Sequence, residues 1–213
     1  MTDKSANALD IKTRFNDYLN SMTRGEAKHL AELALAQSPK VLVVSCCDSR
    51  VDPTTLLNAQ PGEVFTVRNV ANVVPPFEQD NHYHGTSAAI EYAVSVLKIP
   101  HVMVLGHSNC GGVAAACSHE ISNDFHFISH WLDNLHAPVE RVKSDHPGTS
   151  DSDICHHVEK ASVEQSINNL NNFPFVKDAL DEGWLTVTGA WFDISNNSLH
   201  LLNTDTGKFK PIT

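Results

Sequence analysis

The sequence predicts an α/β fold with a mostly parallel central sheet of four or five strands, flanked by helices. Three apolar runs, at residues 41–44, 64–67 and 102–105, are too short for helices and have the pattern of strands buried on both faces. Residues 88–97, between the second and third runs, have helical periodicity. A strand, a helix and a strand joined by a long crossover predict parallel pairing with a right-handed connection.

The N-terminal residues predict a helical arm. Residues 8–22 carry apolar side chains at intervals of three and four, and residues 26–36 are rich in strong helix formers. The rest of the chain has no internal repeat, low-complexity segment or linker. We therefore expect a single domain over residues 1–213, with residues 1–36 as its N-terminal helical arm.

The C-terminal half predicts two further helices and an edge hairpin. Residues 125–135 and 158–170 have helical spacing, and a polar loop is expected at residues 144–153. Residues 185–191 and 198–202 predict strands that pair antiparallel across a short polar turn.

Composition and charge exclude several classes of protein. Of 213 residues, 41% are hydrophobic and 19% charged, which supports one packed core. A net charge of −10 argues against nucleic acid and anionic membranes as partners. The sequence has no apolar run near membrane-spanning length and no secretion signal at its start, and its five cysteines do not suggest a disulfide framework. We therefore expect a cytoplasmic protein.

Two of the predicted strands run directly into residues that can bind a metal. The first leads into residues 45–50 (SCCDSR) and the third into residues 106–112 (GHSNCGG). The carboxyl ends of neighbouring parallel strands form ligand sites, and the spacing of His107 and Cys110 suits one face of a helical turn. A lone cysteine there is usually a small buried apolar residue. Two cysteines and one histidine together favour a zinc site with one open position.

These segments resemble the β-class carbonic anhydrases. Cys-x-Asp-Ser-Arg after the first strand and His-x-x-Cys-Gly after the third are similar to that family's metal site. The segments QPGE (60–63), VRNVAN (67–72) and GTSAAIEYAV (85–94) are similar to family segments in the same order and spacing. The resemblance is close over residues 37–112 and looser over the C-terminal strands.

The resemblance implies a zinc enzyme that reversibly hydrates carbon dioxide to bicarbonate and a proton. One zinc ion per chain would be bound by Cys46, His107 and Cys110. A zinc-bound hydroxide would be oriented by an aspartate–arginine dyad, which falls on Asp48 and Arg50.

The resemblance to the plant-like branch also implies a substrate pocket. The expected lining residues are Gln37, Phe65, Val70, Tyr92 and the backbone amide of Gly111, and Val43 is expected to help keep the pocket apolar. In the family, part of this lining comes from a second subunit. Because the amphipathic arm also needs an apolar surface to lie on, we expect a homodimer or a dimer of dimers.

Two positions distinguish this chain within the family. Cys47 stands where the family usually has serine or another small residue, and the spacing to Asp48 selects Cys46 as the ligand. Family members whose site closes at acid pH tend to carry tryptophan three residues before the first cysteine, where this chain has Val43. Val43 and Gln37 favour the branch whose site stays open.

Three other functions are considered. A hydrolase of CS2 or COS on the same scaffold would have a similar metal site. A non-catalytic zinc-binding regulatory module would need a fourth protein ligand and would have no use for Asp48, Arg50 or Gln37. A nucleotide-binding domain is disfavoured, since the glycines after the strands do not form a phosphate-loop fingerprint.

Overall fold

The computed structural model describes residues 9–80, 82–118 and 125–212, and it divides the chain into two compact units. Residues 1–37 form unit 1 and residues 38–213 form unit 2. The boundary falls beside the expected end of the helical arm.

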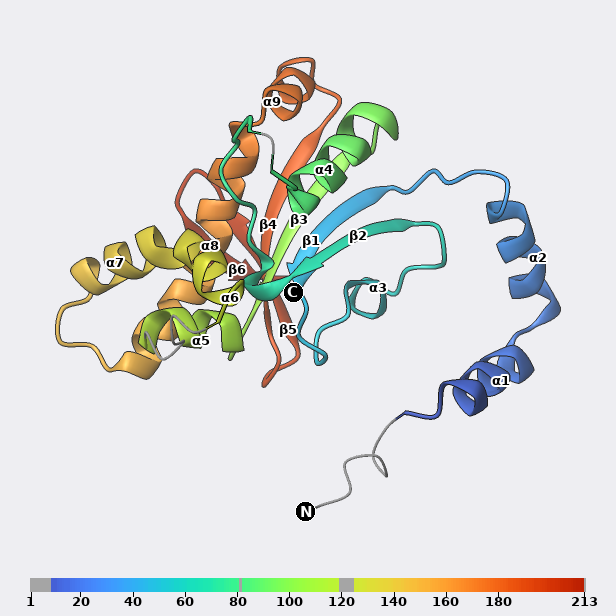
Figure 1. Ribbon diagram of the computed structural model, residues 1–213, viewed down its shortest axis with the longest axis horizontal. Coiled ribbons are helices and arrows are strands. Elements are labelled where there is room, and N and C mark those ends of the chain that lie inside the picture. The colour runs from blue at the N-terminus through green and yellow to red at the C-terminus, as the bar shows by residue number, and fades with distance from the viewer. Residues whose placement is uncertain (1–8, 81, 119–124, 213) are drawn as a thin grey trace. The chain divides into compact units, whose positions relative to one another are not determined.

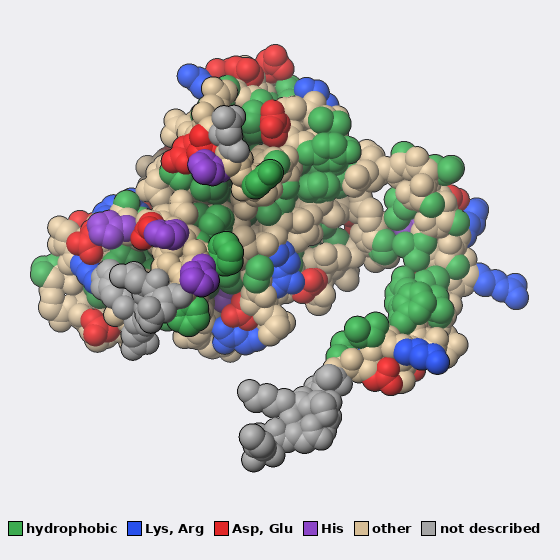
Figure 2. Space-filling model, in the orientation of Figure 1, with side chains coloured by type: hydrophobic (Ala, Val, Ile, Leu, Met, Phe, Trp, Pro, Cys, Tyr) green, Lys and Arg blue, Asp and Glu red, His purple; other side chains and the backbone are tan. Residues whose placement is uncertain are grey.

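Unit 1 consists of two short helices, as the sequence predicts. Helix α1 (Ile11–Ser21) begins after Asp10, which caps its first turn, and the expected start at residue 8 lies outside the described residues. Helix α2 (Arg24–Leu33) begins with a capping box between Thr23 and Glu26. None of the described residues of either helix is buried, and Figure 2 shows hydrophobic side chains gathered along them.

Unit 2 is built on a six-stranded sheet with the order β2-β1-β3-β4-β5-β6. Its strands are β1 (Val41–Cys46), β2 (Val64–Asn69), β3 (His101–His107), β4 (Thr186–Asp193), β5 (Ser198–Asn203) and β6 (Lys208–Pro211). The first four are parallel to one another, and β5 and β6 add antiparallel pairs at one edge. The predicted α/β fold class is therefore confirmed.

The sheet has one strand more than the four or five expected. Strand β6 has the sequence KFKP, in which two lysines flank a single apolar residue and a proline ends the segment. Such a sequence suits an exposed edge strand and carries no alternating apolar pattern that would predict it.

The helices of unit 2 match the predicted positions in part. They are α3 (Pro53–Leu56), α4 (Gly85–Glu91), α5 (Gly111–Ser118), α6 (Ile128–Leu132), α7 (His136–Asp145), α8 (Asp151–Asn171) and α9 (Pro174–Asp181). Three of them, α4, α6 and α8, overlap the predicted helical segments, whereas α3, α5, α7 and α9 were not predicted. Helix α4 continues into a π-helical turn, η3 (Tyr92–Val96). Figure 1 shows α5, α6, α7 and α8 grouped beside the strands.

The polar loop expected at residues 144–153 is shorter than predicted. Helix α7 runs to Asp145, and α8 already begins at Asp151. Ser150 caps α8 by accepting the backbone N–H of Asp153 at 3.2 Å, and two aspartates in the first turn suit the positive end of the helix dipole. Polar residues that suggested a loop therefore start a 21-residue helix.

The strand order places the metal-binding segments side by side. Strand β1 is central, with β2 on one side and β3 on the other. The hydrophobic residues of β1 are almost all fully buried, as expected for a central parallel strand. Because β1 and β3 are parallel neighbours, their carboxyl ends meet at one edge of the sheet. None of the described helices is long and apolar enough to cross a membrane.

Candidate metal centre

Cys46, His107 and Cys110 come together at the carboxyl ends of β1 and β3. One ligand atom from each lies within 4.8 Å of the other two, and the two sulfur atoms are 3.9 Å apart. All three side chains are buried. The prediction that these residues converge is therefore confirmed by the geometry.

The local backbone explains this convergence. Cys46 is the last residue of β1 and His107 the last of β3. The chain then turns through Asn109, whose φ of 55° lies in the left-handed region that asparagine adopts more readily than most residues. This turn brings Cys110 back to the edge of the sheet, directly before α5.

A close approach between two segments completes the frame. A Cβ atom on Gly112 would lie 2.6 Å from Cγ1 of Val70 and 3.1 Å from Cβ of Ala71. Only glycine therefore lets the start of α5 reach the turn at residues 70–72. In this turn Ala71 has a φ of 66°, and its backbone N–H contributes to lowering the pKa of Cys46.

The two thiols interact strongly with each other. One thiol donates to the other across 3.9 Å, and this shared hydrogen bond lowers the pKa of one member of the pair and raises that of the other, with Cys46 as the more acidic thiol. Backbone N–H groups also favour the thiolate at each cysteine. The arrangement therefore stabilises negative charge on sulfur, the form that binds metals.

His107 presents one ring nitrogen to the same space. Its Nδ1 lies 2.9 Å from the carbonyl oxygen of Ser108, which fixes the ring with the proton on Nδ1. Its buried Nε2 has no hydrogen-bond partner among the described residues. Burial lowers the pKa of His107, but Cys46, the Ser108 carbonyl and Asp48 outweigh it and raise the pKa. A buried Nε2 atom without a hydrogen-bond partner, beside two thiols, is explained if this atom is itself a ligand of a metal ion.

Asp48 and Arg50 form a bidentate pair next to this group. Arg50 donates from Nε to Oδ1 at 2.9 Å and from Nη2 to Oδ2 at 2.7 Å, and its backbone N–H also binds Oδ1 at 2.9 Å. These bonds hold the pKa of Asp48 well below its ordinary value. Oδ2 lies 3.9 Å from Nε2 of His107.

Arg68, whose contribution the sequence did not reveal, holds the turn that carries the dyad. From β2 it donates to the carbonyl oxygens of Cys46, Asp48 and Val51 at 2.7–2.8 Å. Three carbonyl groups that follow a strand end thereby receive donors, and the turn is tied to the neighbouring strand. The family resemblance included the segment VRNVAN (67–72), which contains Arg68. No sequence pattern, however, shows that a side chain binds backbone groups some 20 residues away.

The comparisons with known proteins agree with this geometry. The sequence profile described as "Carbonic anhydrase" matches residues 41–199. The chain is 37% identical over 201 residues to Beta carbonic anhydrase 6, mitochondrial, of Arabidopsis thaliana, a match that covers 93% of this chain and 69% of the relative. This chain belongs to the β-class carbonic anhydrases.

Solved β-carbonic anhydrases share the fold of this one. The β-carbonic anhydrase CcaA superposes with a TM-score of 0.88 at 23% identity and covers 94% of this chain and 90% of its own, which is a likeness of fold. A structure from Sordaria macrospora, titled as one of two tetrameric β-carbonic anhydrases, has a TM-score of 0.73 at 31% identity, with coverage of 94% and 93%.

The residues of this carbonic anhydrase fit the zinc ion that the family uses. The thiols of Cys46 and Cys110 and the Nε2 atom of His107, which has no hydrogen-bond partner, form a donor set that zinc prefers. Among the described residues, this group is the only cluster of three or more potential ligands.

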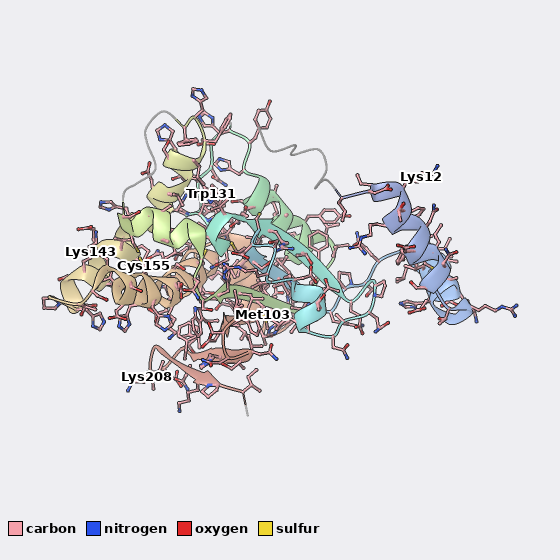
Figure 3. All side chains as sticks on the ribbon, turned by 90° about the horizontal axis from the view of Figure 1, so that it is seen from below. Lys12, Met103, Trp131, Lys143, Cys155 and Lys208 are labelled. Atoms are coloured by element: carbon pink, nitrogen blue, oxygen red, sulfur yellow. The ribbon has the colours of Figure 1, made fainter. Side chains whose placement is uncertain are left out.

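The expected pocket residues of the carbonic anhydrase have different surroundings. The rings of Phe65 and Tyr92 lie 6.2 Å apart between centroids. The side chain of Val70 lies against Gly112 in the first turn of α5. Its carbonyl oxygen accepts the indole N–H of Trp131, labelled in Figure 3, at 2.8 Å. Gly111 is the first residue of α5.

Three other residues that the sequence analysis singled out are not members of the ligand cluster. Gln37 is exposed and ends unit 1, so the fold of unit 2 alone does not bring it to the metal centre. Cys47 is exposed, in contrast to Cys46. The interpretation of Val43 as pocket lining is wrong, because Val43 packs in a separate cluster with Leu105 and other residues. Alternation along β1 turns Val43 and Cys46 to opposite faces.

Proposed function

We propose that the centre catalyses the reversible hydration of carbon dioxide to bicarbonate and a proton, with zinc held by Cys46, His107 and Cys110. When bound, zinc supplies the Lewis acidity that makes a water molecule nucleophilic near neutral pH. The roles of the chain's own residues follow from their hydrogen-bonding capacity.

The observation that carries the proposal is the remaining acceptor position on Asp48. A carboxylate oxygen accepts about two hydrogen bonds. Oδ1 already receives two from Arg50, whereas Oδ2 receives one. The free position therefore belongs to Oδ2, the oxygen 3.9 Å from Nε2 of His107. There it would accept a hydrogen bond from the nucleophilic water and so turn a lone pair of that water toward carbon dioxide.

Arg50 keeps this carboxylate in place, so that it would not occupy the open position of the metal. Its Nη2 also donates to the carbonyl oxygen of Asn109 at 2.9 Å, so the guanidinium is anchored to the turn that carries Cys110. This arrangement supports a site that stays open, since both oxygens of Asp48 are held by Arg50.

We further propose that Phe65, Val70 and Tyr92 provide an apolar pocket for a nonpolar gas. The amide of Gly111 and the side chain of Gln37 would donate to a substrate oxygen that gains negative charge. Gln37 would act from the arm, as the family resemblance implies. A regulatory zinc module would need a fourth ligand, and in the described part of the chain the cluster has three members.

We propose a homodimer or a dimer of dimers in the cytoplasm. The assembly is supported by the exposed apolar side chains of α1 and by the tetrameric Sordaria macrospora proteins. The cytoplasmic location is proposed from cysteine usage, whereas the names of two relatives from Arabidopsis thaliana include a mitochondrial and a chloroplastic location.

The test measures zinc content and carbon dioxide hydration in cysteine variants. We expect one zinc ion per chain in the native protein, and loss of both metal and activity in Cys46→Ser and Cys110→Ser. Cys47→Ser is the matched control and should retain both. Full zinc occupancy in Cys110→Ser would contradict the ligand assignment. Turnover of COS or CS2 without hydration of carbon dioxide would favour the alternative hydrolase.

A further inference from the structure

Glu159, on α8, is a buried carboxylate to which the proposed reaction gives no role. Its exposed fraction is 5%, and charged side chains are seldom buried so deeply unless they are paired. Oε1 accepts the backbone N–H of Cys110 at 3.3 Å, and Oε2 accepts the indole N–H of Trp191 at 3.3 Å. Nδ1 of His156 lies 3.4 Å from Oε2. The carboxylate therefore joins a metal-ligand turn to strand β4.

The donors around Glu159 require both of its oxygens to accept. Cys110 and Trp191 each present an N–H group, one to each oxygen. Nε2 of His156 lies 3.0 Å from the ammonium group of Lys160, which can only donate, so the ring proton of His156 is on the nitrogen facing Glu159. A carboxylate satisfies this arrangement, whereas a carboxamide offers one oxygen only.

We infer that Glu159 is a positioning residue for the zinc site, which holds the Asn109–Cys110 turn and so sets how firmly the metal is retained. The inference rests on the proposed assignment of Cys110 as a ligand. Groups that bind metal ligands from outside typically contribute 10–100-fold to metal affinity.

The same turn links Glu159 to the dyad. The amide of Cys110 binds Glu159, and the carbonyl oxygen of Asn109 in the same peptide group accepts from Arg50 at 2.9 Å. One peptide plane is therefore held at its N–H by the carboxylate and at its oxygen by the guanidinium that orients Asp48. Loosening one end of this plane loosens a ligand and the dyad together.

The test measures the rate at which the purified holoenzyme loses zinc to the chelator dipicolinate. Glu159→Gln must set its NH2 group against either Cys110 or Trp191, so we expect zinc loss about 10–100-fold faster than in the native protein. Glu159→Asp keeps the charge but is too short to reach both donors, and it should also lose zinc faster. The control Ile167→Val lies two turns along α8, in a different core cluster, and should retain zinc as the native protein does.

A rescue experiment separates positioning from general stability. Adding Trp191→Phe to Glu159→Gln removes the buried competing donor, so the glutamine oxygen can face Cys110. Its NH2 group then meets only the ring of His156, which is half exposed and can turn away. We expect the double variant to lose zinc more slowly than Glu159→Gln, although its thermal unfolding midpoint falls further because a large buried side chain is reduced. A merely structural role would make both quantities worse together.

The outcomes distinguish this inference from the proposed function. If Glu159→Gln and Glu159→Asp fold and lose zinc at the native rate, while Cys110→Ser is metal-free, the inference is wrong and the ligand assignment stands. Faster zinc loss in the double variant than in Glu159→Gln would also overturn the inference. If Cys110→Ser keeps its zinc, the ligand assignment itself fails.

Discussion

At the scale of single residues, the hydrogen bonds between Asp48 and Arg50 are central to the proposed reaction. In that proposal they decide whether the carboxylate orients the nucleophile or competes for the metal. Three donors from Arg50 occupy Asp48, and Arg50 is itself anchored to Asn109. The dyad is exposed enough to reach solvent, yet its geometry leaves one acceptor position on Oδ2. Arg68 adds to this by holding the backbone of the same turn.

Asp48→Asn should lower carbon dioxide hydration about 10²–10⁴-fold while zinc content stays native, because the orienting acceptor is lost and no metal ligand is touched. Arg50 keeps the pKa of Asp48 well below its ordinary value of about 3.9. The carboxylate is therefore ionised at every pH above this range, and its contribution disappears only as the pH falls through the lowered pKa. The ratio of native to variant activity should be constant from about pH 6 to pH 9.

Arg50→Ala is the companion variant. It frees Asp48 to approach the open metal position, so turnover should fall while zinc content is spared. Native zinc with undiminished activity in either variant would show that the dyad has no part in the reaction. A crystal structure near pH 8 with Asp48 on zinc and Arg50 unpaired would place this protein in the branch whose site closes.

At the scale of elements, the start of α5 packs against the turn at residues 70–72. Helix α5 begins directly after Cys110, and the backbone of the turn lowers the pKa of the Cys46 thiol. The distance between α5 and this turn depends on Gly112, which has no room for a Cβ. The neighbouring Gly111 has room for a side chain, because nothing lies within 4 Å of a Cβ atom placed there.

Gly112→Ala should destabilise the fold by about 1–3 kcal/mol, because its methyl group would overlap Val70 and Ala71. It should also weaken zinc retention, because the start of α5, which follows Cys110, would be pushed away from the turn at residues 70–72. Urea unfolding and zinc content measure the two effects. Gly111→Ala is the matched control and should keep native stability and zinc, and an equal loss in both variants would rule out this packing argument.

At the scale of the whole molecule, the exposed apolar side chains of α1 bear on assembly. Ile11, Phe15, Tyr18 and Leu19 are each about half exposed or more, and no described residue of unit 1's helices is buried. A helix with such a face is typical of one that lies on an apolar surface. The proposed homodimer or dimer of dimers would supply that surface.

Sedimentation equilibrium of the full chain should give a mass of two or four times the chain mass of 23.4 kDa, for a dimer or a dimer of dimers. Phe15→Asp should shift the equilibrium toward the monomer, because it places a charge within the apolar face of α1. Asn16→Asp introduces the same charge at the neighbouring position and should leave the assembly native. A fully active monomer in the unaltered protein would end this proposal and the pocket shared between subunits that the family resemblance implies.

The sequence by itself determined the fold class, the family and the three residues that converge as a candidate metal site. Short apolar runs show buried strands because their pattern depends on local periodicity and on burial alone. Cys46, His107 and Cys110 were predictable because each follows a strand end, and neighbouring parallel strands end at the same edge. The family resemblance then assigned roles to Asp48 and Arg50, which spacing alone would not separate from a loop ion pair.

Only the tertiary structure decided what holds these residues in place. Arg68 binds carbonyl groups of another strand, and Glu159 receives the amide of Cys110 from 49 residues away in the chain. Such contacts depend on the three-dimensional path of the backbone, which no periodicity records. The same reason explains the wrong interpretation of Val43, whose neighbours are set by the face of the sheet to which it turns, and the missed strand β6, which forms because β5 offers it an edge to pair with.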